Sequence, residues 1–192
     1  MHIAIEGMDG AGKTSVAKLL AEKIGFKFVE KPLHYILDED GTLDNYMRVS
    51  KDVNKQSEMS IKTLFYGLGN VFVKSKFKGE NIVTDRHLVS NYFWNCDETT
   101  QDIFDVILKH ASIPQITFLL YANEEVRLKR IIARNPLDDD VNKINLYPHA
   151  YEKMKECLEK NKMDYVLIDN SEKTCEEVVS LIIDYLKVAN II

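Results

Sequence analysis

Short apolar runs alternate with longer amphipathic stretches along this chain. The runs of strand length are Ile3–Ile5, Phe26–Val29, Ile82–Thr84, Ile116–Tyr121 and Tyr165–Ile168. Between them, apolar residues recur every three or four positions, as they do on helices. Strands separated by helical crossovers pair in parallel, and right-handed crossovers bring all their carboxyl ends to one edge. We therefore expect a three-layer α/β fold, a parallel five-stranded sheet flanked by helices, with the active site along that edge.

The ends of three helices can be placed from local signals. The apolar stripe after the first run stops before Gly25, a residue suited to the left-handed position that ends a helix. A second helix is predicted from a Ser57 cap to Gly79. Thr174 and Glu177 have the spacing of a capping box before the last apolar stripe. The least periodic stretch, 31–56, is expected to form a substrate-side loop or short helices.

Length and charge narrow the class of protein. The 192 residues suit one domain, 1–192, with no internal repeat or linker. A net charge of -5 argues against a protein that coats nucleic acid. Apolar runs are too short to span a bilayer, so we expect no membrane partner. The cysteines are far apart and form no CxxC pair, which predicts reduced thiols packed in the core of a cytoplasmic protein; they are Cys96, Cys157 and Cys175.

One segment carries specific chemistry. Residues 7–14 read Gly-Met-Asp-Gly-Ala-Gly-Lys-Thr and fit the phosphate-loop pattern between a strand and an amphipathic helix. In such a loop the backbone N–H groups converge on phosphate oxygens, and a lysine neutralises the β- and γ-phosphates. We expect Lys13 to do this and Thr14 to hold Mg²⁺ through its hydroxyl. The predicted ATP-binding residues here are Gly7, Gly10, Ala11, Gly12, Lys13, Thr14 and Ser15.

Further segments resemble the thymidylate kinase family of P-loop kinases. Asp85-Arg86 at the end of the third strand resembles that family's Asp-Arg signature, and residues 6–14, 128–134 and 165–171 resemble its first loop, lid helix and adenine-side loop. The resemblance implies a P-loop NTPase fold, a homodimer, and the reaction of ATP with dTMP to give ADP and dTDP. It also implies acceptor-binding roles for Asp9, Glu30, Phe65, Tyr66, Arg86 and Asn91, and an ATP-binding role for Ser171. A carboxylate one strand from Thr14 can bind Mg²⁺, so Asp85 joins the metal site; a simple Asp85–Arg86 salt bridge is the alternative.

Phosphoryl transfer depends on alignment and on cations around the moving group. Gly10 offers no side chain where some family members carry an arginine, so the lid has to supply one. Arg127, Arg130 and Arg134 lie at helical spacing before Asn135-Pro136. We favour Arg130 and Arg134, together with Lys13 and Arg86, as catalytic residues, and place the lid at about 134–146. A solvated basic helix face is the alternative.

The resemblance is incomplete in the second long helix. Gly69 stands where the family usually has a phosphate-binding arginine, so a monophosphate acceptor would depend on Arg86, helped by Arg48 or Lys31. A deoxynucleoside kinase that uses Glu30 as general base is therefore a rival interpretation. A nucleotide-binding regulator without catalysis is a second one, because fold alone does not determine function.

Overall fold

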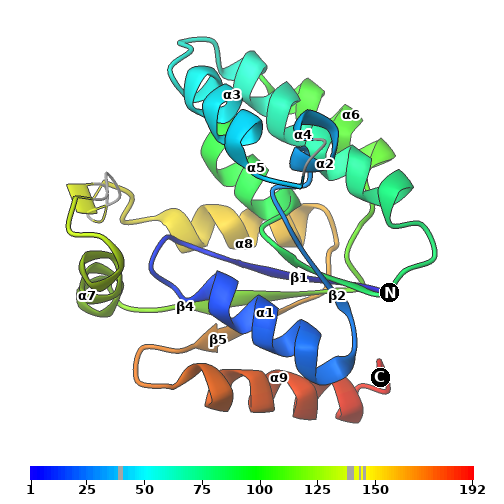
Figure 1. Ribbon diagram of the computed structural model, residues 1–192, viewed down its shortest axis with the longest axis vertical. Coiled ribbons are helices and arrows are strands. Elements are labelled where there is room, and N and C mark those ends of the chain that lie inside the picture. Colours follow the sequence, from blue (N-terminus) through cyan, green and yellow to red (C-terminus); the bar gives the residue numbers. More distant parts are fainter. Residues whose placement is uncertain (39–40, 138–140, 143, 145) are drawn as a thin grey trace.

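The computed structural model describes residues 1–38, 41–137, 141–142, 144 and 146–192. Its centre is a five-stranded sheet in the order β2-β3-β1-β4-β5, and every neighbouring pair is parallel (Figure 1). The strands are β1 (His2–Gly7), β2 (Lys27–Glu30), β3 (Ile82–Asp85), β4 (Ile116–Tyr121) and β5 (Tyr165–Asp169). The sequence prediction of a parallel α/β sheet is confirmed.

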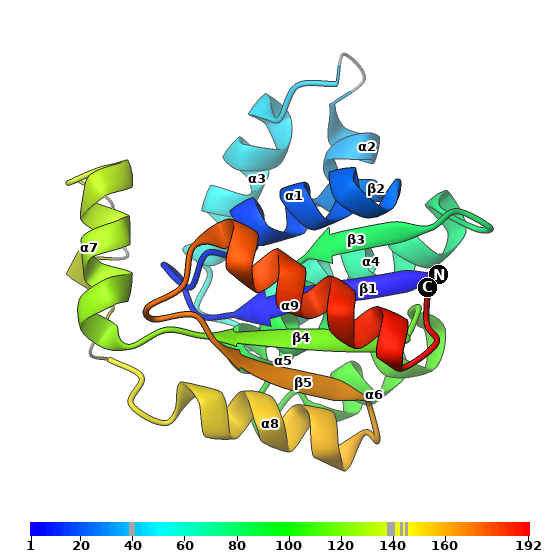
Figure 2. The same cartoon turned by 90° about the horizontal axis from the view of Figure 1, so that it is seen from below.

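Two helices cover one face of the sheet, α1 (Lys13–Ile24) and α9 (Cys175–Val188) (Figure 2). Ile3 and Ile5 point to this face because alternate residues of a strand share a side, and they pack in one core with Leu20 and Ile182. Both predicted helix ends are confirmed. Gly25 follows α1 with φ of 70°, and the capping box of Thr174 is complete at the start of α9.

The opposite face is covered by α4 (Met59–Lys76), α5 (Leu88–Asn95), α6 (Gln101–His110) and α8 (Ala150–Lys160). Their core includes the fully buried Phe104, Leu119 and Met154. Cys96 and Cys157 are buried here as free thiols, so the prediction that cysteines pack in the core holds for both; Cys175 is half-buried. No helix in the described parts of the chain is long and apolar enough to cross a membrane.

Three further helices surround the carboxyl edge of the sheet. The aperiodic stretch forms α2 (His34–Leu37) and α3 (Asp44–Asn54), so the expectation of short helices there is confirmed. The basic segment forms α7 (Glu124–Arg134). Figure 1 shows α7 beyond the carboxyl ends of the strands, while both chain termini lie at the opposite edge.

The predicted ends of the second long helix were wrong. Helix α4 begins at Met59 after an extended Glu58, so the Ser57 hydroxyl lies one residue too early to cap it. At the other end α4 stops at Lys76, and the next residue, Phe77, is buried against the sheet beside Val29 of β2 and Ile82 of β3. The burial of Phe77 therefore ends the helix before the helical pattern of the sequence ends.

Gly67 allows α4 and α6 to pack closely. A Cβ atom at Gly67 would lie 2.1 Å from Cδ1 of Ile107. We predict that Gly67→Ala destabilises the protein by about 1–2 kcal/mol, because overpacking outweighs the helix-propensity gain of about 1 kcal/mol. In an Ile107→Ala background the same change is expected to stabilise. Chemical denaturation of the four proteins tests this, and an equal effect of Gly67→Ala in both backgrounds would contradict it.

Candidate active site

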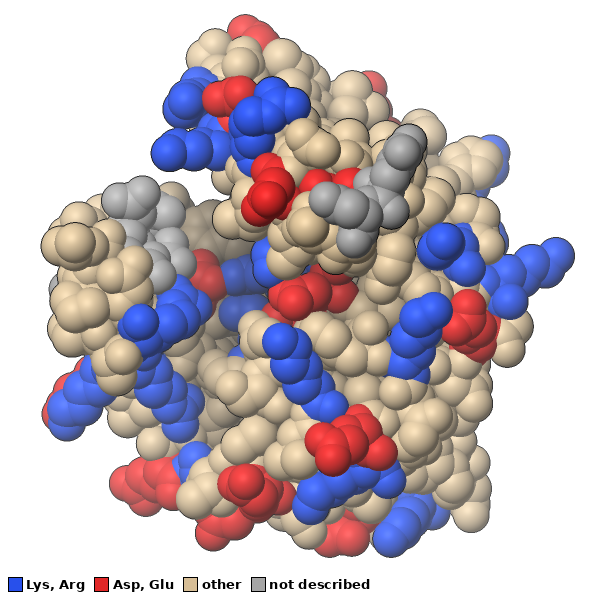
Figure 3. All heavy atoms as spheres, in the orientation of Figure 1, with Lys and Arg blue, Asp and Glu red and all other residues tan. Residues whose placement is uncertain are grey.

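A cavity of about 1390 Å³ opens at the carboxyl edge of the sheet. This is larger than the roughly 300–1,000 Å³ of a site for one small ligand, so it can hold two nucleotides. Its lining has seven lysines and arginines against three aspartates and glutamates, although the whole chain is acidic. Figure 3 shows the hollow between the α7 side and the α2–α3 side, with charged side chains inside it. The cavity therefore suits phosphorylated ligands.

The loop between β1 and α1 has the shape that the phosphate-loop pattern predicts. Gly10 and Gly12 have φ of 80° and 89°, in the left-handed region that favours glycine. A Cβ atom at Gly10 would lie 2.6 Å from the backbone oxygen of Arg127 on α7. Close packing of α7 on the loop thus leaves no space for a side chain there, which explains why this chain has no arginine in the loop.

Lys13 is 5% exposed and points into the loop. Its Nζ donates a hydrogen bond to the backbone oxygen of Met8 at 2.8 Å and lies 3.8 Å from Oδ1 of Asp9. Burial lowers the pKa of Lys13 to about 8, and the nearby Arg86 guanidinium adds to this effect, although Asp9 and Asp85 oppose it. The ammonium is therefore held at a cost that a bound polyanion would offset.

Thr14 and Asp85 meet at the point where a divalent cation is expected. The Thr14 hydroxyl donates a hydrogen bond to Oδ2 of Asp85. The other carboxylate oxygen, Oδ1, is buried and has no hydrogen-bond partner among the described residues. Carboxylate and hydroxyl oxygens are ligands that Mg²⁺ prefers. The two residues therefore fit a magnesium site, although no group of three His, Cys, Asp or Glu suited to a metal occurs among the described residues.

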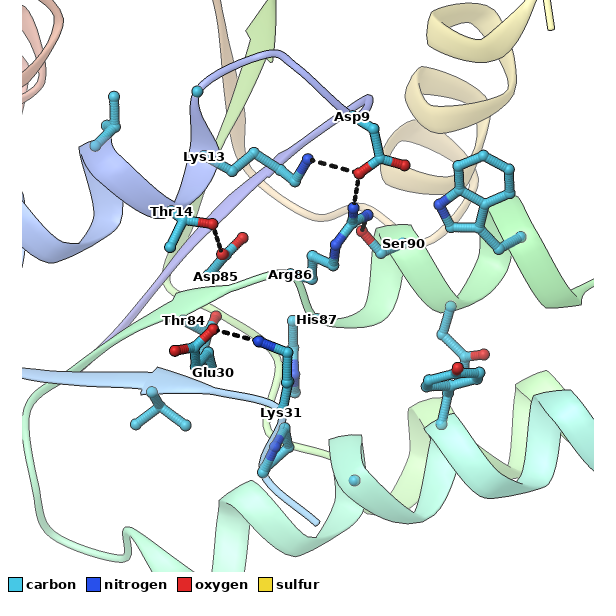
Figure 4. Close-up of a pocket in the computed structure, with 18 of the residues that line it drawn as sticks. Asp9, Lys13, Thr14, Glu30, Lys31, Thr84, Asp85, Arg86, His87 and Ser90 are labelled. Carbon is cyan, nitrogen blue, oxygen red and sulfur yellow. Dashed lines mark hydrogen bonds and ion pairs between the residues drawn. The ribbon is translucent and has the colours of Figure 1, made fainter. Parts of the chain in front are cut away.

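Arg86 pairs with Asp9 rather than with its neighbour Asp85. One of its terminal nitrogens binds Oδ1 of Asp9, and the other donates to Ser90 Oγ at 3.4 Å (Figure 4). The simple Asp85–Arg86 salt bridge considered as an alternative is absent from the described residues. Arg86 has φ of 68°, a rare conformation for a residue with a side chain, and such strain is common at functional sites. Figure 4 shows Lys13, Asp9 and Arg86 pointing toward one another.

Glu6 is a site residue that the motif analysis left without a role. It is fully buried, and its Oε1 accepts hydrogen bonds from the backbone N–H groups of His87, Val89 and Ser90. Its Oε2 accepts a bond from the Ser90 hydroxyl at 2.5 Å. Burial raises the pKa of Glu6, while these donors oppose the rise. The carboxylate thus caps the first turn of α5 and fixes the chain that carries Arg86. The sequence gives no signal for this role, because the partners of Glu6 lie at residues 87–90, far along the chain.

Asn91 belongs to a row of amides at the floor of the cavity. Its side-chain nitrogen donates to Asn70 Oδ1 at 3.1 Å, and its side-chain oxygen accepts from Asn95 at 3.1 Å. The Asn70 amide in turn lies 3.2 Å from Nδ1 of His87. Because Nε2 of His87 faces the backbone oxygen of Ser112 at 2.8 Å, Nε2 carries the proton and Nδ1 accepts. This row joins α4 to α5 and makes the floor rigid.

Most of the other predicted residues also line the cavity. Tyr66, Glu30, Ser15 and Arg134 are among them. Phe65 and Ser171 are not in the lining. Phe65 stacks on Tyr46 and meets Tyr66 edge to face, and the Ser171 hydroxyl accepts a hydrogen bond from the backbone N–H of Asn123. Gly7 and Ala11 are also outside the lining.

At Gly69, a Cβ atom would contact Pro32 at 3.3 Å and Leu33 at 3.4 Å. A side chain at position 69 would therefore press against the segment after β2.

The three lid arginines differ in their surroundings. Arg127 is buried and donates to the backbone oxygen of Asp9 at 2.8 Å, so it supports the phosphate loop. Arg130 is half-buried beside Gly12 and contacts Asn170, a cavity residue that sequence reasoning did not single out. Arg134 is exposed at the end of α7. The acidic stretch 138–140 of the predicted lid lies outside the described residues.

Comparison with known proteins decides the family. The family model of thymidylate kinase matches residues 5–182. The chain belongs to the thymidylate kinase family. It is accordingly a nucleotide-binding transferase, a nucleoside monophosphate kinase.

Individual relatives within and around the thymidylate kinase family carry different acceptor names. The chain is 27% identical to a probable thymidylate kinase of Methanocaldococcus jannaschii, covering 97% of this chain and 96% of that protein. It is 29% identical to a putative adenylate kinase of Thermococcus gammatolerans, covering 97% and 86%. Names of relatives therefore leave the acceptor to be argued from the site.

Solved structures support the same fold. A deoxyadenosine kinase of M. mycoides with bound dCTP matches with a TM-score of 0.66 at 20% identity, covering 98% of this chain and all of that one. A thymidylate kinase of Candida albicans matches with a TM-score of 0.64 at 16% identity, covering 98% and 92%. At these identities the matches show a shared nucleoside-kinase P-loop fold.

The buried His87 makes a testable contribution to acid sensitivity. Burial lowers its pKa to about 4, below the 6.5 of an exposed histidine. Because the unfolded chain binds the proton first, stability is lost as pH falls from about 6.5 toward 4, by roughly 3 kcal/mol. We expect His87→Gln to flatten this part of the stability profile measured by denaturation. The same change at the exposed His110 is the control, and an identical slope in both variants would argue against this account.

Proposed function

We propose that this enzyme transfers the γ-phosphoryl group of ATP to dTMP, giving ADP and dTDP, and so contributes to dTTP biosynthesis. The observation that carries the proposal is the position of Asp9. Its Oδ1 contacts both Lys13, in the loop expected to hold the donor, and Arg86, at the end of the neighbouring strand. Two cations that share one carboxylate are positioned to bring two phosphorylated molecules end to end.

The donor side of the site supports ATP. The first turn of α1 follows the left-handed Gly12, so its free N–H groups and partial positive charge face the cavity. Lys13 adds a buried cation at the same place. Thr14 and Asp85 would hold Mg²⁺, which supplies charge neutralisation on the β- and γ-phosphates when bound. Of the proposed ATP-binding residues of this loop, Gly10 and the four residues from Gly12 to Ser15 line the cavity.

The acceptor side supports a monophosphate. Arg86 presents a planar guanidinium, suited to bidentate phosphate binding, and Ser90 helps to orient it. Lys31 directly follows β2, whose last residue Glu30 is in register with Asp85, and it lines the same cavity as Arg86. Tyr66 and Trp94 line the wall where a base would stack. Asp9 can also accept a hydrogen bond from the sugar 3′-hydroxyl.

Catalysis in this proposal rests on alignment. The phosphoryl group passes between the loop and Arg86, with its charge stabilised by Lys13, Arg130 and Arg134. Arg134 reaches the cavity from the end of α7, at the start of the predicted lid. Closure of that segment over the nucleotides would exclude water and prevent wasteful hydrolysis of ATP.

The rival nucleoside kinase needs Glu30 as a general base. In the structure Oε2 of Glu30 lies 2.7 Å from Nζ of Lys31, and Oε1 lies 3.9 Å from Nζ of Lys18. A carboxylate with a lysine beside each oxygen is poorly placed to accept a proton from a hydroxyl. This arrangement favours the monophosphate over the nucleoside as acceptor.

We also propose a cytoplasmic homodimer, as the family resemblance implies. Three exposed apolar side chains on α4, Ile61, Leu64 and Leu68, lie on one face of that helix at spacings of three and four residues. A second copy of the same helix would cover them, since closed symmetric dimers are the commonest oligomers.

The decisive experiment identifies the phosphorylated product. The protein is incubated with Mg-ATP and, separately, dTMP, thymidine, dAMP, dCMP and the other nucleosides and monophosphates. We predict acceptor-dependent ADP formation that is fastest with dTMP. In Arg86→Met, kcat/KM for dTMP is expected to fall by roughly 10- to 150-fold, because a hydrogen bond to a charged group is worth about 1.5–3 kcal/mol. Preference for thymidine would establish the nucleoside kinase, and an absence of acceptor-dependent ADP would indicate a regulator.

A further inference from the structure

Asn170 connects the phosphate loop to the lid helix. It follows β5 and is 3% exposed. Its side-chain nitrogen donates to the backbone oxygen of Ala11 at 2.6 Å. Its own backbone N–H donates to Tyr121 at the end of β4, at 2.8 Å. The amide is therefore anchored on the rigid edge of the sheet and not on a free loop.

The guanidinium of Arg130 is held by the same residue. Nη1 of Arg130 donates to Asn170 Oδ1 at 3.0 Å, and Nη2 donates to the Asn170 backbone oxygen at 3.0 Å. Nη1 also lies 3.5 Å from the backbone oxygen of Gly10. Two parallel bonds from a planar fork fix its orientation as well as its position.

All of these partners are neutral. Among the described residues no carboxylate lies within ion-pair distance of Arg130. The arginine is thus fixed by carbonyl oxygens and keeps its full charge. An aspartate in place of Asn170 would bind the same Arg130 guanidinium but would neutralise its positive charge. The amide is therefore the better residue for a site that has to attract an anion.

The fixed guanidinium lies directly against the phosphate loop. A Cβ atom at Gly12 would be 3.8 Å from Nη1 of Arg130 and 3.3 Å from the Asn170 amide. Any larger residue at position 12 would press on this pair. The cation is therefore already beside the expected triphosphate before a ligand arrives, whereas Arg134 is exposed at the end of the same helix.

We propose that Asn170 is the positioning residue for Arg130, which it holds uncompensated beside the triphosphate of ATP. This rests on the proposed function, because it assumes that the loop binds ATP. Preorganised charge of this kind needs no rearrangement when charge develops in the transition state.

A double-mutant cycle tests the proposal. Arg130→Ala is expected to lower kcat/KM for ATP about 100-fold or more, and Asn170→Ala about 10- to 100-fold. If Asn170 acts through Arg130, the double variant matches Arg130→Ala within about threefold. Independent, multiplying losses would overturn the proposal. Asn123→Ala, which removes the N-cap of α7 without touching Arg130, is the matched control, and its loss is expected to multiply with that of Arg130→Ala.

Asn170→Asp provides a second arm if Asn170→Ala folds poorly. It keeps an acceptor for Arg130 but neutralises the arginine and loses the bond to Ala11, so KM for ATP is expected to rise about tenfold or more, and far less in the Arg130→Ala background. An unchanged KM would contradict the proposal. Failure of the wild-type protein to bind Mg-ATP would instead reject the proposed function, so the two failures are distinguishable.

Discussion

The buried ammonium of Lys13 is the feature on which the site depends. A cation removed from water is unfavourable unless an anion accompanies it. Asp9 is 3.8 Å away and already bound to Arg86, and the closest partner of Lys13 is a neutral backbone oxygen. The compensation is therefore incomplete, and the pKa of Lys13 falls to about 8, with burial as the largest cause. A bound polyphosphate would complete the compensation, in line with the proposed role of Lys13 in ATP binding.

The rest of the molecule keeps other cations close to this lysine. Parallel pairing of β1 with β3 places Arg86 beside the loop, and the left-handed backbone at Arg86 turns its side chain toward Asp9. The Glu6 carboxylate fixes the first turn of α5 by accepting hydrogen bonds from its backbone N–H groups. On the other side, α7 packs closely on Gly10, and its Arg127 and Arg130 contact the backbone of the loop. The fold thus determines where the positive charges lie, because each cation is placed by the end of a strand or by a helix packed on the loop.

The sequence was sufficient for those features that depend on local spacing. Strand positions, the glycine that ends α1 and the capping box of α9 followed from period and cap chemistry. The phosphate loop followed from its glycines and Lys13. Family resemblance found Arg86, and the alternation of strand and helix found the edge where the site lies.

Features that depend on contacts between distant parts of the chain could not be predicted from residue spacing and cap chemistry. Helix α4 ends early because Phe77 is buried beside Val29 and Ile82. Val29 lies more than 45 residues before Phe77 in the sequence, and Ile82 lies five residues after it. Glu6 and Asn170 looked like ordinary strand-end residues, since their partners Ser90 and Arg130 come from other elements. The close approach of Pro32 to Gly69 likewise joins parts of the chain that are far apart in sequence. Long-range contacts, not propensities, decide these positions.

Calorimetric titration of Mg-ATP at pH 8 in buffers of different ionisation enthalpy measures whether Lys13 takes up a proton when the ligand binds. Burial lowers the pKa of Lys13 to about 8, so part of the free lysine is unprotonated at that pH, and a bound triphosphate would hold the protonated form. We predict binding with net proton uptake that declines as the pH is lowered to 7 and is abolished in Lys13→Met. Folded protein that binds no Mg-ATP, or binds it equally well in Lys13→Met without proton uptake, would contradict the account.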